Sequence, residues 1–179
     1  MVGSQYHMNY SPDEDRIFIF VRDNKATEHA FGLTRRLFKK LWPALGKTVQ
    51  EMSEAASKTT PEMKNDVLQF EQQGAVSEAI QSGTLSNKPL PEVENRIAYL
   101  VKTIRISDNP RGGKTLTLSD GKRSMSIPFS HEQLIVLCDA LKALVVNSDW
   151  NLSLLYPWES GNQTESATTH AANVKPTHH

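Results

Sequence analysis

The sequence predicts an α+β fold in which two strand-turn-strand-helix units form antiparallel sheet and are separated by a helical insertion. Apolar and polar side chains alternate in short runs, and these runs come in pairs. This period of two residues is typical of a half-buried strand. Each pair encloses a turn signal and leads, through a capping residue, into apolar residues at helical spacing. The first of these units lies within residues 17–49 and the second within 114–146.

The second unit shows this pattern most completely. Asp120-Gly121 between its strands is a hairpin signal, because glycine accepts the positive φ of a tight turn. Pro128 cannot donate a ladder hydrogen bond, so its strand is expected to lie at a sheet edge or to end there. Ser130 and Gln133 match a helix capping box. The apolar face of that helix is formed by Leu134, Leu137, Leu141, Leu144 and Val145.

The first unit follows the same order at a constant offset. Matched from cap to cap, Thr34 corresponds to Ser130, and the apolar residues on both sides correspond as well. The pairs are Phe31/Ile127, Leu33/Phe129, Phe38/Leu134, Leu41/Leu137, Ala44/Ala140, Leu45/Leu141 and Val49/Val145. We therefore predict an internal repeat, the alternative being two unrelated amphipathic strand-helix units that share a common pattern.

The rest of the chain is divided around these units. Residues 96–106 are the longest strand candidate, and a helix is expected from Pro61 to about Ser82. The apolar face of this helix would carry Met63, Val67, Phe70 and Ile80. The predicted segments are a polar N-terminal segment (1–15), the first unit (16–58), a helical insertion and loop (59–91), the second unit (92–149), an extended apolar segment (150–158) and a disordered tail (159–179).

Composition restricts the functional classes. The net charge is zero, so bulk electrostatics favour neither nucleic acid nor an anionic membrane. Cys138 is the single cysteine, which argues against an intrachain disulfide or a cysteine-based metal site. There is no apolar run of membrane-spanning length and no signal-peptide core. We expect a cytoplasmic protein without a cofactor, a bound metal or a membrane partner.

The sequence carries no recognisable catalytic motif. Residues 112–115 (Gly-Gly-Lys-Thr) match the end of a phosphate-binding loop, but the required first glycine is replaced by Asp108 and the segment enters a strand instead of a helix. The histidines are not spaced as a helical ligand pair, and no carboxylate pair stands out for acid-base chemistry. We therefore expect a protein that is not an enzyme.

Basic residues are concentrated in the second unit. The predicted nucleic-acid contacts are Arg105, Arg111, Lys114, Lys122 and Arg123. Together with basic residues of the first predicted helix, they would form a basic surface. The alternative is a solvated face whose charges pair with the acidic helix predicted at 61–82.

The run from Ser126 to Leu134 (Ser-Ile-Pro-Phe-Ser-His-Glu-Gln-Leu), which ends a hairpin and opens a helix, resembles the end of the positive-cofactor-four type of single-stranded-DNA-binding domain. The duplicated units are also similar to the Pur-type and Whirly folds. The resemblance implies an antiparallel sheet whose exposed face binds single-stranded DNA or RNA through basic and aromatic residues. This sequence departs from it in its long helical insertion and in the outward residues of the hairpin, which include no aromatic side chain. These outward residues are Thr115, Thr117, Ser124 and Ser126.

Two functions remain open at this point. One is a single-stranded nucleic-acid-binding module, and the other is a protein-interaction or assembly module that binds no nucleic acid. A contiguous basic stripe on the sheet would favour the first function, and an apolar groove would favour the second.

A further apolar segment follows the last helix. Five large side chains in it share one strand parity: Trp150, Leu152, Leu154, Tyr156 and Trp158. Left exposed they would form a sticky patch, so we predict that the segment is extended and docks on an apolar surface. That surface belongs either to its own domain, which would complete the core, or to a partner in a self-associated protein.

Overall fold

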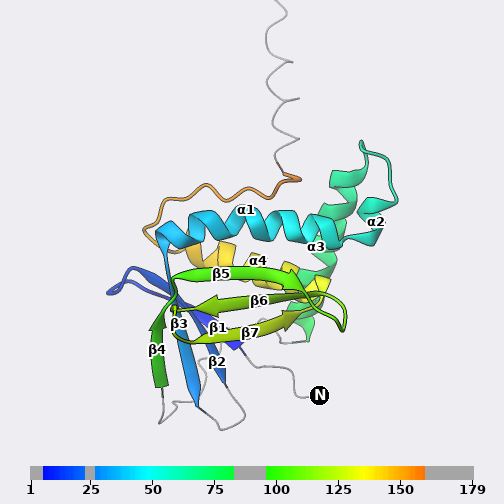
Figure 1. The fold of residues 1–179 in the computed structure, drawn as a ribbon. Coiled ribbons are helices and arrows are strands. Elements are labelled where there is room, and N and C mark those ends of the chain that lie inside the picture. Colours follow the sequence, from blue (N-terminus) through cyan, green and yellow to red (C-terminus); the bar gives the residue numbers. More distant parts are fainter. Residues whose placement is uncertain (1–5, 23–26, 83–95, 160–179) are drawn as a thin grey trace, which may run out of the picture.

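The computed structural model describes residues 6–22, 27–82 and 96–159. The first half of the chain contains β1 (Tyr6–Ser11), β2 (Arg16–Arg22), β3 (Glu28–Thr34), α1 (Arg35–Met52), α2 (Glu54–Ser57) and α3 (Lys64–Gln81). The second half contains β4 (Arg96–Leu100), β5 (Thr103–Asp108), β6 (Lys114–Ser119), β7 (Ser124–Phe129) and α4 (His131–Val146). The predicted α+β class is confirmed (Figure 1). The loop at 83–91 and residues 160–179 of the predicted tail lie outside the described residues.

The strands form two sheets. One sheet has the order β1-β2-β3-β4 and is antiparallel except for its parallel β3–β4 pair, and the other has the antiparallel order β5-β6-β7. A parallel pair needs a crossover connection, which the chain through α1, α2 and α3 supplies. Since β7 has a neighbour on one side only, the edge position predicted from Pro128 is correct.

The two units share their strand order and their register. Each consists of a three-stranded antiparallel meander followed by a helix, one strand more than the two that were predicted. In the first unit the extra strand is β1, which lies in the segment predicted to be polar and N-terminal to the unit. Ile19 pairs with Phe31 in the first meander, and Leu116 pairs with Ile127 in the second. The correspondence of Phe31 with Ile127, derived from the caps alone, therefore also holds in the strand pairing.

Both predicted helix caps are present. The Leu37 amide donates to Thr34 Oγ1 (3.3 Å) at the start of α1. At the start of α4, the Gln133 amide donates to Ser130 Oγ (3.3 Å), and the Ser130 amide donates to Gln133 Oε1 (2.9 Å). These bonds satisfy amides that have no partner inside the helix, which explains why each helix begins where it does.

The predicted single strand at 96–106 is instead divided between the two sheets. The Val101 amide donates to the carbonyl of Gly32 in the first sheet (3.0 Å), whereas the Lys102 amide donates to the carbonyl of Ser119 in the second (2.8 Å). The chain therefore changes sheets between adjacent residues. The alternation of side chains along one strand does not record which neighbouring strand its backbone will bond.

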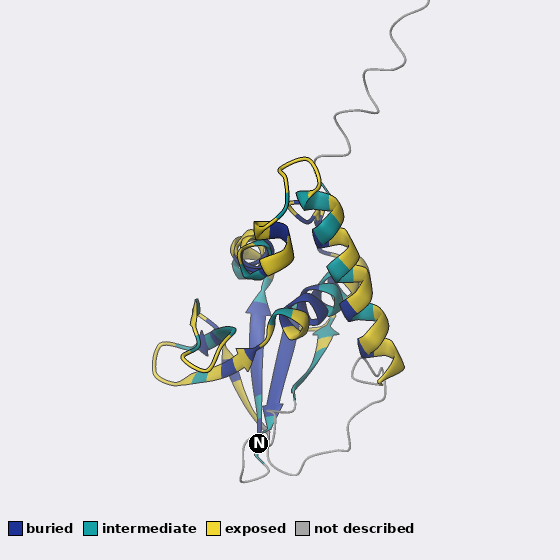
Figure 2. Ribbon diagram, turned by 90° about the vertical axis from the view of Figure 1, so that its right-hand side faces the viewer, coloured by how far each residue is buried: buried dark blue, intermediate teal, exposed yellow. Residues whose placement is uncertain are grey.

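Most of the buried apolar residues form one core, shown in Figure 2 by the dark strands under the helices. Ile17, Ile19 and Val21 of β2 face this core, and Phe18 and Phe20 face the opposite side of the sheet. β2 is therefore buried on both faces. Its position between β1 and β3 explains the pattern.

α3 differs from its prediction in both its start and its buried face. It begins at Lys64, whereas a start at Pro61 was expected. Phe70 and Ile80, which were expected to face the core, are 76% and 63% exposed. The residues of α3 that are buried are Leu68, Ala75 and Ala79. α3 packs against α4, and small side chains such as alanine allow two helices to approach closely.

The apolar segment at 150–158 packs on its own chain and runs along α1 (Figure 1). Trp150, Leu154, Tyr156 and Trp158 are buried, and Leu152 is half-buried against the core. It is held by side-chain bonds and forms no β-strand. Trp150 Nε1 donates to Asp15 Oδ1 (2.5 Å), Trp42 Nε1 donates to the Leu155 carbonyl (3.1 Å) and Trp158 Nε1 donates to Gln72 Oε1 (3.1 Å). Glu159, which was assigned to the tail, forms an ion pair with Lys142 (3.1 Å).

None of the helices in the described ranges is both long and apolar enough to cross a membrane.

Candidate binding groove

The five basic residues predicted to bind nucleic acid are spread along the second sheet. Arg111 lies in the β5–β6 turn, whereas Lys122 and Arg123 lie in the β6–β7 turn at the other end of the strands. Arg105 is exposed in the middle of β5, between the two turns. The structure therefore spreads these charges along the sheet and does not gather them into one cluster.

Two of these five side chains have partners among the residues that the structure describes. Lys114 Nζ forms an ion pair with Asp108 Oδ1 (2.7 Å). Arg123 donates to the Tyr99 hydroxyl (3.2 Å), and its guanidinium lies 5.7 Å from the centre of the Tyr99 ring. Lys114 also has the parity of Leu116, so it points to the inner face of the sheet instead of the outer face.

The outer face of the second sheet is rich in hydroxyl groups. Arg105 of β5 lies opposite Thr117 of β6, which in turn lies opposite Ser126 of β7. The hydroxyls of Thr117 and Ser126 are hydrogen-bonded to each other (2.8 Å). The described part of this face carries no aromatic side chain, as the sequence indicated, so it offers no surface on which a base can stack.

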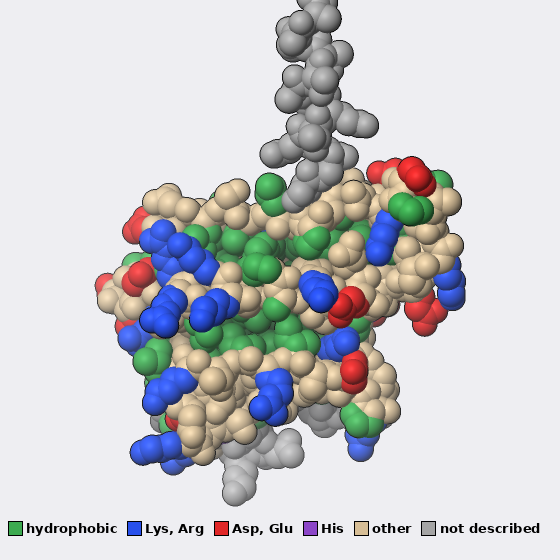
Figure 3. Space-filling view, turned by 45° about the horizontal axis from the view of Figure 1, so that its top comes forward, with side chains coloured by type: hydrophobic (Ala, Val, Ile, Leu, Met, Phe, Trp, Pro, Cys, Tyr) green, Lys and Arg blue, Asp and Glu red, His purple; other side chains and the backbone are tan. Residues whose placement is uncertain are grey.

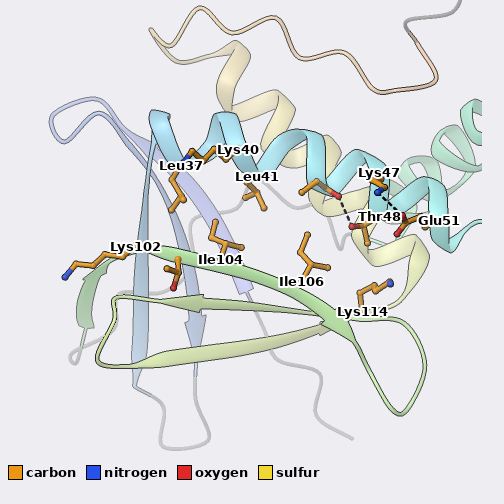
Figure 4. Close-up of a pocket in the computed structure, with 12 residues that line it drawn as sticks. Leu37, Lys40, Leu41, Lys47, Thr48, Glu51, Lys102, Ile104, Ile106 and Lys114 are labelled. Carbon is orange, nitrogen blue, oxygen red and sulfur yellow. Dashed lines mark hydrogen bonds and ion pairs between the residues drawn. The ribbon is translucent and has the colours of Figure 1, made fainter.

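A groove of about 570 Å³ separates α1 from β5 (Figure 4). Its apolar lining comes from Leu37, Leu41, Ala44, Ile104 and Ile106. In Figure 4 the leucines point from the helix toward the strand, and the isoleucines point from the strand toward the helix. The two elements are distant in sequence, and their side chains form the walls of one groove.

Local periodicity explains both walls. Ile104 and Ile106 are half-buried on the inner face of β5, because alternate residues of a strand share a face. Leu37, Leu41 and Ala44 recur at helical spacing on one side of α1. Further along the same side, Thr48 Oγ1 donates to the Ala44 carbonyl (2.7 Å), which satisfies its hydroxyl within an apolar lining.

The rim of the groove is positively charged. Four lysines and one glutamate line it: Lys40, Lys47, Lys102, Lys114 and Glu51. Lys47 pairs with Glu51 (3.6 Å) and Lys114 with Asp108, whereas Lys40 and Lys102 form no ion pair with a carboxylate in the described ranges. Figure 3 shows hydrophobic side chains in a hollow bordered by basic ones. The groove therefore combines an apolar floor with an excess of positive charge.

The acidic helix does not neutralise this charge through direct pairs. Among the residues that the structure describes, no ion pair joins α1 to α3. The alternative reading of the basic residues, in which they pair with the acidic helix, therefore finds no support in the described contacts.

β5 forms one wall of the groove and is also a sheet edge. It is hydrogen-bonded to β6 on one side, and in the strand order it has no strand on the other side. An edge strand presents backbone N–H and C=O groups that can pair with a further strand. The groove therefore offers two kinds of contact together, an apolar floor and a row of backbone partners.

Other candidate chemistry in the described ranges is weak. Burial raises the pKa of the Cys138 thiol from 9.0 to about 12, so this residue stays protonated in the core and is not a nucleophile. In the same ranges, no three or more His, Cys, Asp or Glu side chains are placed to hold a metal ion.

Comparison with protein-family models, with curated proteins and with solved structures found no match. The interpretation of the site therefore rests on its geometry. Of the predicted nucleic-acid contacts only Lys114 lines the groove, and the sequence analysis did not identify the groove itself. One local signal was present: Lys114 shares the strand parity of Leu116 and Leu118, which places it on the inner face.

Proposed function

We propose that this protein is a non-enzymatic interaction module that binds a segment of a partner protein in the groove between α1 and β5. The observation that carries the proposal is the apolar, lysine-rimmed groove beside a sheet edge. Its volume of about 570 Å³ lies in the range of ligand-binding pockets and suffices for a few side chains.

A protein ligand fits this groove better than a nucleic acid. The side chains lining it include leucine and isoleucine but no aromatic residue, whereas single strands are commonly held by bases stacked on aromatic rings. Aliphatic side chains of a peptide would instead bury apolar surface against the same floor, which is favourable without any stacking geometry.

The test is a selection of displayed random peptides on the immobilised native protein. Ala44→Trp fills the groove from an exposed position of α1, and Ala143→Trp is the matched control at an exposed position of α4 outside the groove. Selected peptides should bind the native protein and the Ala143→Trp variant, and lose at least about tenfold in affinity for Ala44→Trp. If every selected peptide binds Ala44→Trp as well as it binds the native protein, the groove is not the binding site.

A second function, binding of single-stranded nucleic acid, is favoured by a different observation. Arg105, Arg111, Lys122 and Arg123 follow one another along the second sheet, beside its hydroxyl-rich face. A single strand of nucleic acid lying along these basic residues would contact them through its phosphates, and its affinity would fall as the salt concentration rises. We propose this as the alternative function of the protein.

This alternative is tested with a labelled oligothymidylate of about 20 nucleotides, by fluorescence anisotropy at low salt. Arg105→Ala combined with Arg111→Ala should weaken its binding and flatten the salt dependence, whereas Ala44→Trp should leave it unchanged. The two proposed functions therefore respond to different substitutions. If the native protein does not bind the oligonucleotide at low salt, this alternative is excluded.

A further inference from the structure

Comparing the two repeat units shows what is unusual about the groove. In the first unit, β1 is the edge strand and α4, the helix of the other unit, packs directly against it. In the second unit, β5 takes the place of β1 and α1 takes the place of α4. There the groove separates helix and strand. Equivalent positions of the fold are thus closed in one unit and open in the other.

The strand residues at these equivalent positions differ in kind. Strand pairing makes Tyr6 equivalent to Ile104 and Met8 equivalent to Ile106, because each pair occupies the same register against the next strand. Tyr6 is larger than Ile104, whereas Met8 differs from Ile106 mainly in shape, and all four side chains pack against the core. Beside the two isoleucines, the space between β5 and α1 remains open as the groove.

Resting on the proposed function, we propose that the ligand is an extended acidic segment of a partner protein, which adds to the free edge of β5 as a fourth strand of the second sheet. Its backbone would pair with the outward N–H and C=O groups of β5. Its inward side chains, at every second position, would be aliphatic and would lie beside Ile104 and Ile106.

Charge complementarity determines the remaining positions of this segment. The outward side chains of an added strand lie on the same side as Arg105, which is exposed in the middle of β5. Lys102 lines the groove beside the start of β5, and Lys40 and Lys47 line it from α1, about two helical turns apart. An added strand thus lies beside cations of both walls and beside Arg105, which favours glutamate or aspartate at its outward positions.

The length of the segment follows from β5. Six residues form β5, and an added strand that pairs along all of it places about three side chains in the groove. The expected motif is therefore a run of alternating aliphatic and acidic residues of about this length. Such a run has its own strand propensity through its β-branched residues, so ordering it on binding costs less conformational entropy.

The first experiment uses a labelled peptide of about nine alternating valine and glutamate residues, titrated with the full chain by fluorescence anisotropy. The native protein should bind it, and should not bind the matched peptide in which lysine replaces glutamate. Lys40→Glu and Lys102→Glu should each weaken binding by about tenfold. Lys39→Glu, a neighbouring exposed lysine of α1 that does not line the groove, should change it by less than about twofold.

The second experiment changes only the peptide, so it does not depend on how a variant protein folds. N-methylation removes a backbone donor without altering the side chains. Methylating alternate residues in the register that faces β5 should abolish binding, and methylating the other register should leave it almost unchanged. The proposal of an added acidic strand is wrong if methylation leaves the affinity unchanged in both registers. It is also wrong if the lysine peptide binds as tightly as the glutamate peptide.

These outcomes separate this inference from the proposed function. Selected peptides that lack acidic alternation but lose affinity for Ala44→Trp would overturn the acidic strand and leave the groove as a peptide-binding site. Selected peptides that are insensitive to Ala44→Trp would overturn both. Binding of the oligothymidylate with no binding of the glutamate peptide would assign the basic residues to nucleic acid and overturn the acidic strand.

Discussion

Replacing Gly46 with alanine tests how the apolar C-terminal segment is docked. Gly46 is buried within α1, and a Cβ atom added to it would lie 2.7 Å from Cδ and 3.1 Å from Cγ of Pro157. Both distances are shorter than normal van der Waals contacts between carbon atoms. The added methyl group therefore requires the segment at 150–158 to move away from α1.

The expected effect combines two opposing contributions. Alanine in the interior of a helix is more favourable than glycine by about 1 kcal/mol. Overpacking of a filled site costs about 1–3 kcal/mol. Gly46→Ala should therefore lower the free energy of unfolding by up to about 2 kcal/mol, although the same substitution normally stabilises a helix.

Gly74→Ala is the matched control. Gly74 lies in the interior of α3, and an added Cβ there meets no atom within 4 Å. This substitution should raise the free energy of unfolding by about 1 kcal/mol. The two variants should thus differ by about 1–3 kcal/mol, or roughly 3–9 °C in Tm for a domain of this size.

The assay is urea unfolding followed by circular dichroism, together with limited chymotrypsin digestion of the native state. Gly46→Ala should increase cleavage at the aromatic residues of the segment, because the displaced segment opens more readily. If both variants gain stability equally and chymotrypsin cleavage is unchanged, the segment at 150–158 does not lie against Gly46 as it does in the structure.

Two further predictions concern buried side chains of the core. Trp150→Ala should lower the free energy of unfolding by about 3–5 kcal/mol, because this side chain is fully buried, whereas Leu155→Ala, at 42% exposure, should change it by about 0.5 kcal/mol or less in the same urea titration. Equal losses for both would contradict the packing of the segment. Burial raises the pKa of the Cys138 thiol to about 12 in the folded chain, whereas its pKa in the unfolded chain is 9.0. Its contribution to the free energy of unfolding is therefore complete below pH 9.0 and is lost as the pH rises toward 12. Cys138→Ala should reduce this alkaline loss, and a thiol reagent at pH 8 should label the native protein only when urea is added; rapid labelling of the native protein would refute the burial.

Local patterns predicted the elements of this fold, because the interactions that define them join residues close in sequence. The bonds at the caps Thr34 and Ser130 span three residues, and the alternation around Leu116 and Leu118 places side chains on one face of a strand. The same local signals, matched at one offset, predicted the repeat that the strand pairing shows.

The sequence by itself thus determined the α+β class, the two strand-turn-strand-helix units and the apolar character of the segment at 150–158. The tertiary structure decided the sheet change after Val101, the buried face of α3 and the surface on which Trp158 rests. It also decided the candidate groove. The groove exists only because Leu41 of α1 and Ile104 of β5, which are distant in the chain, line its opposite walls. Contacts between distant residues depend on how whole elements pack, and no local spacing in the sequence encodes that packing.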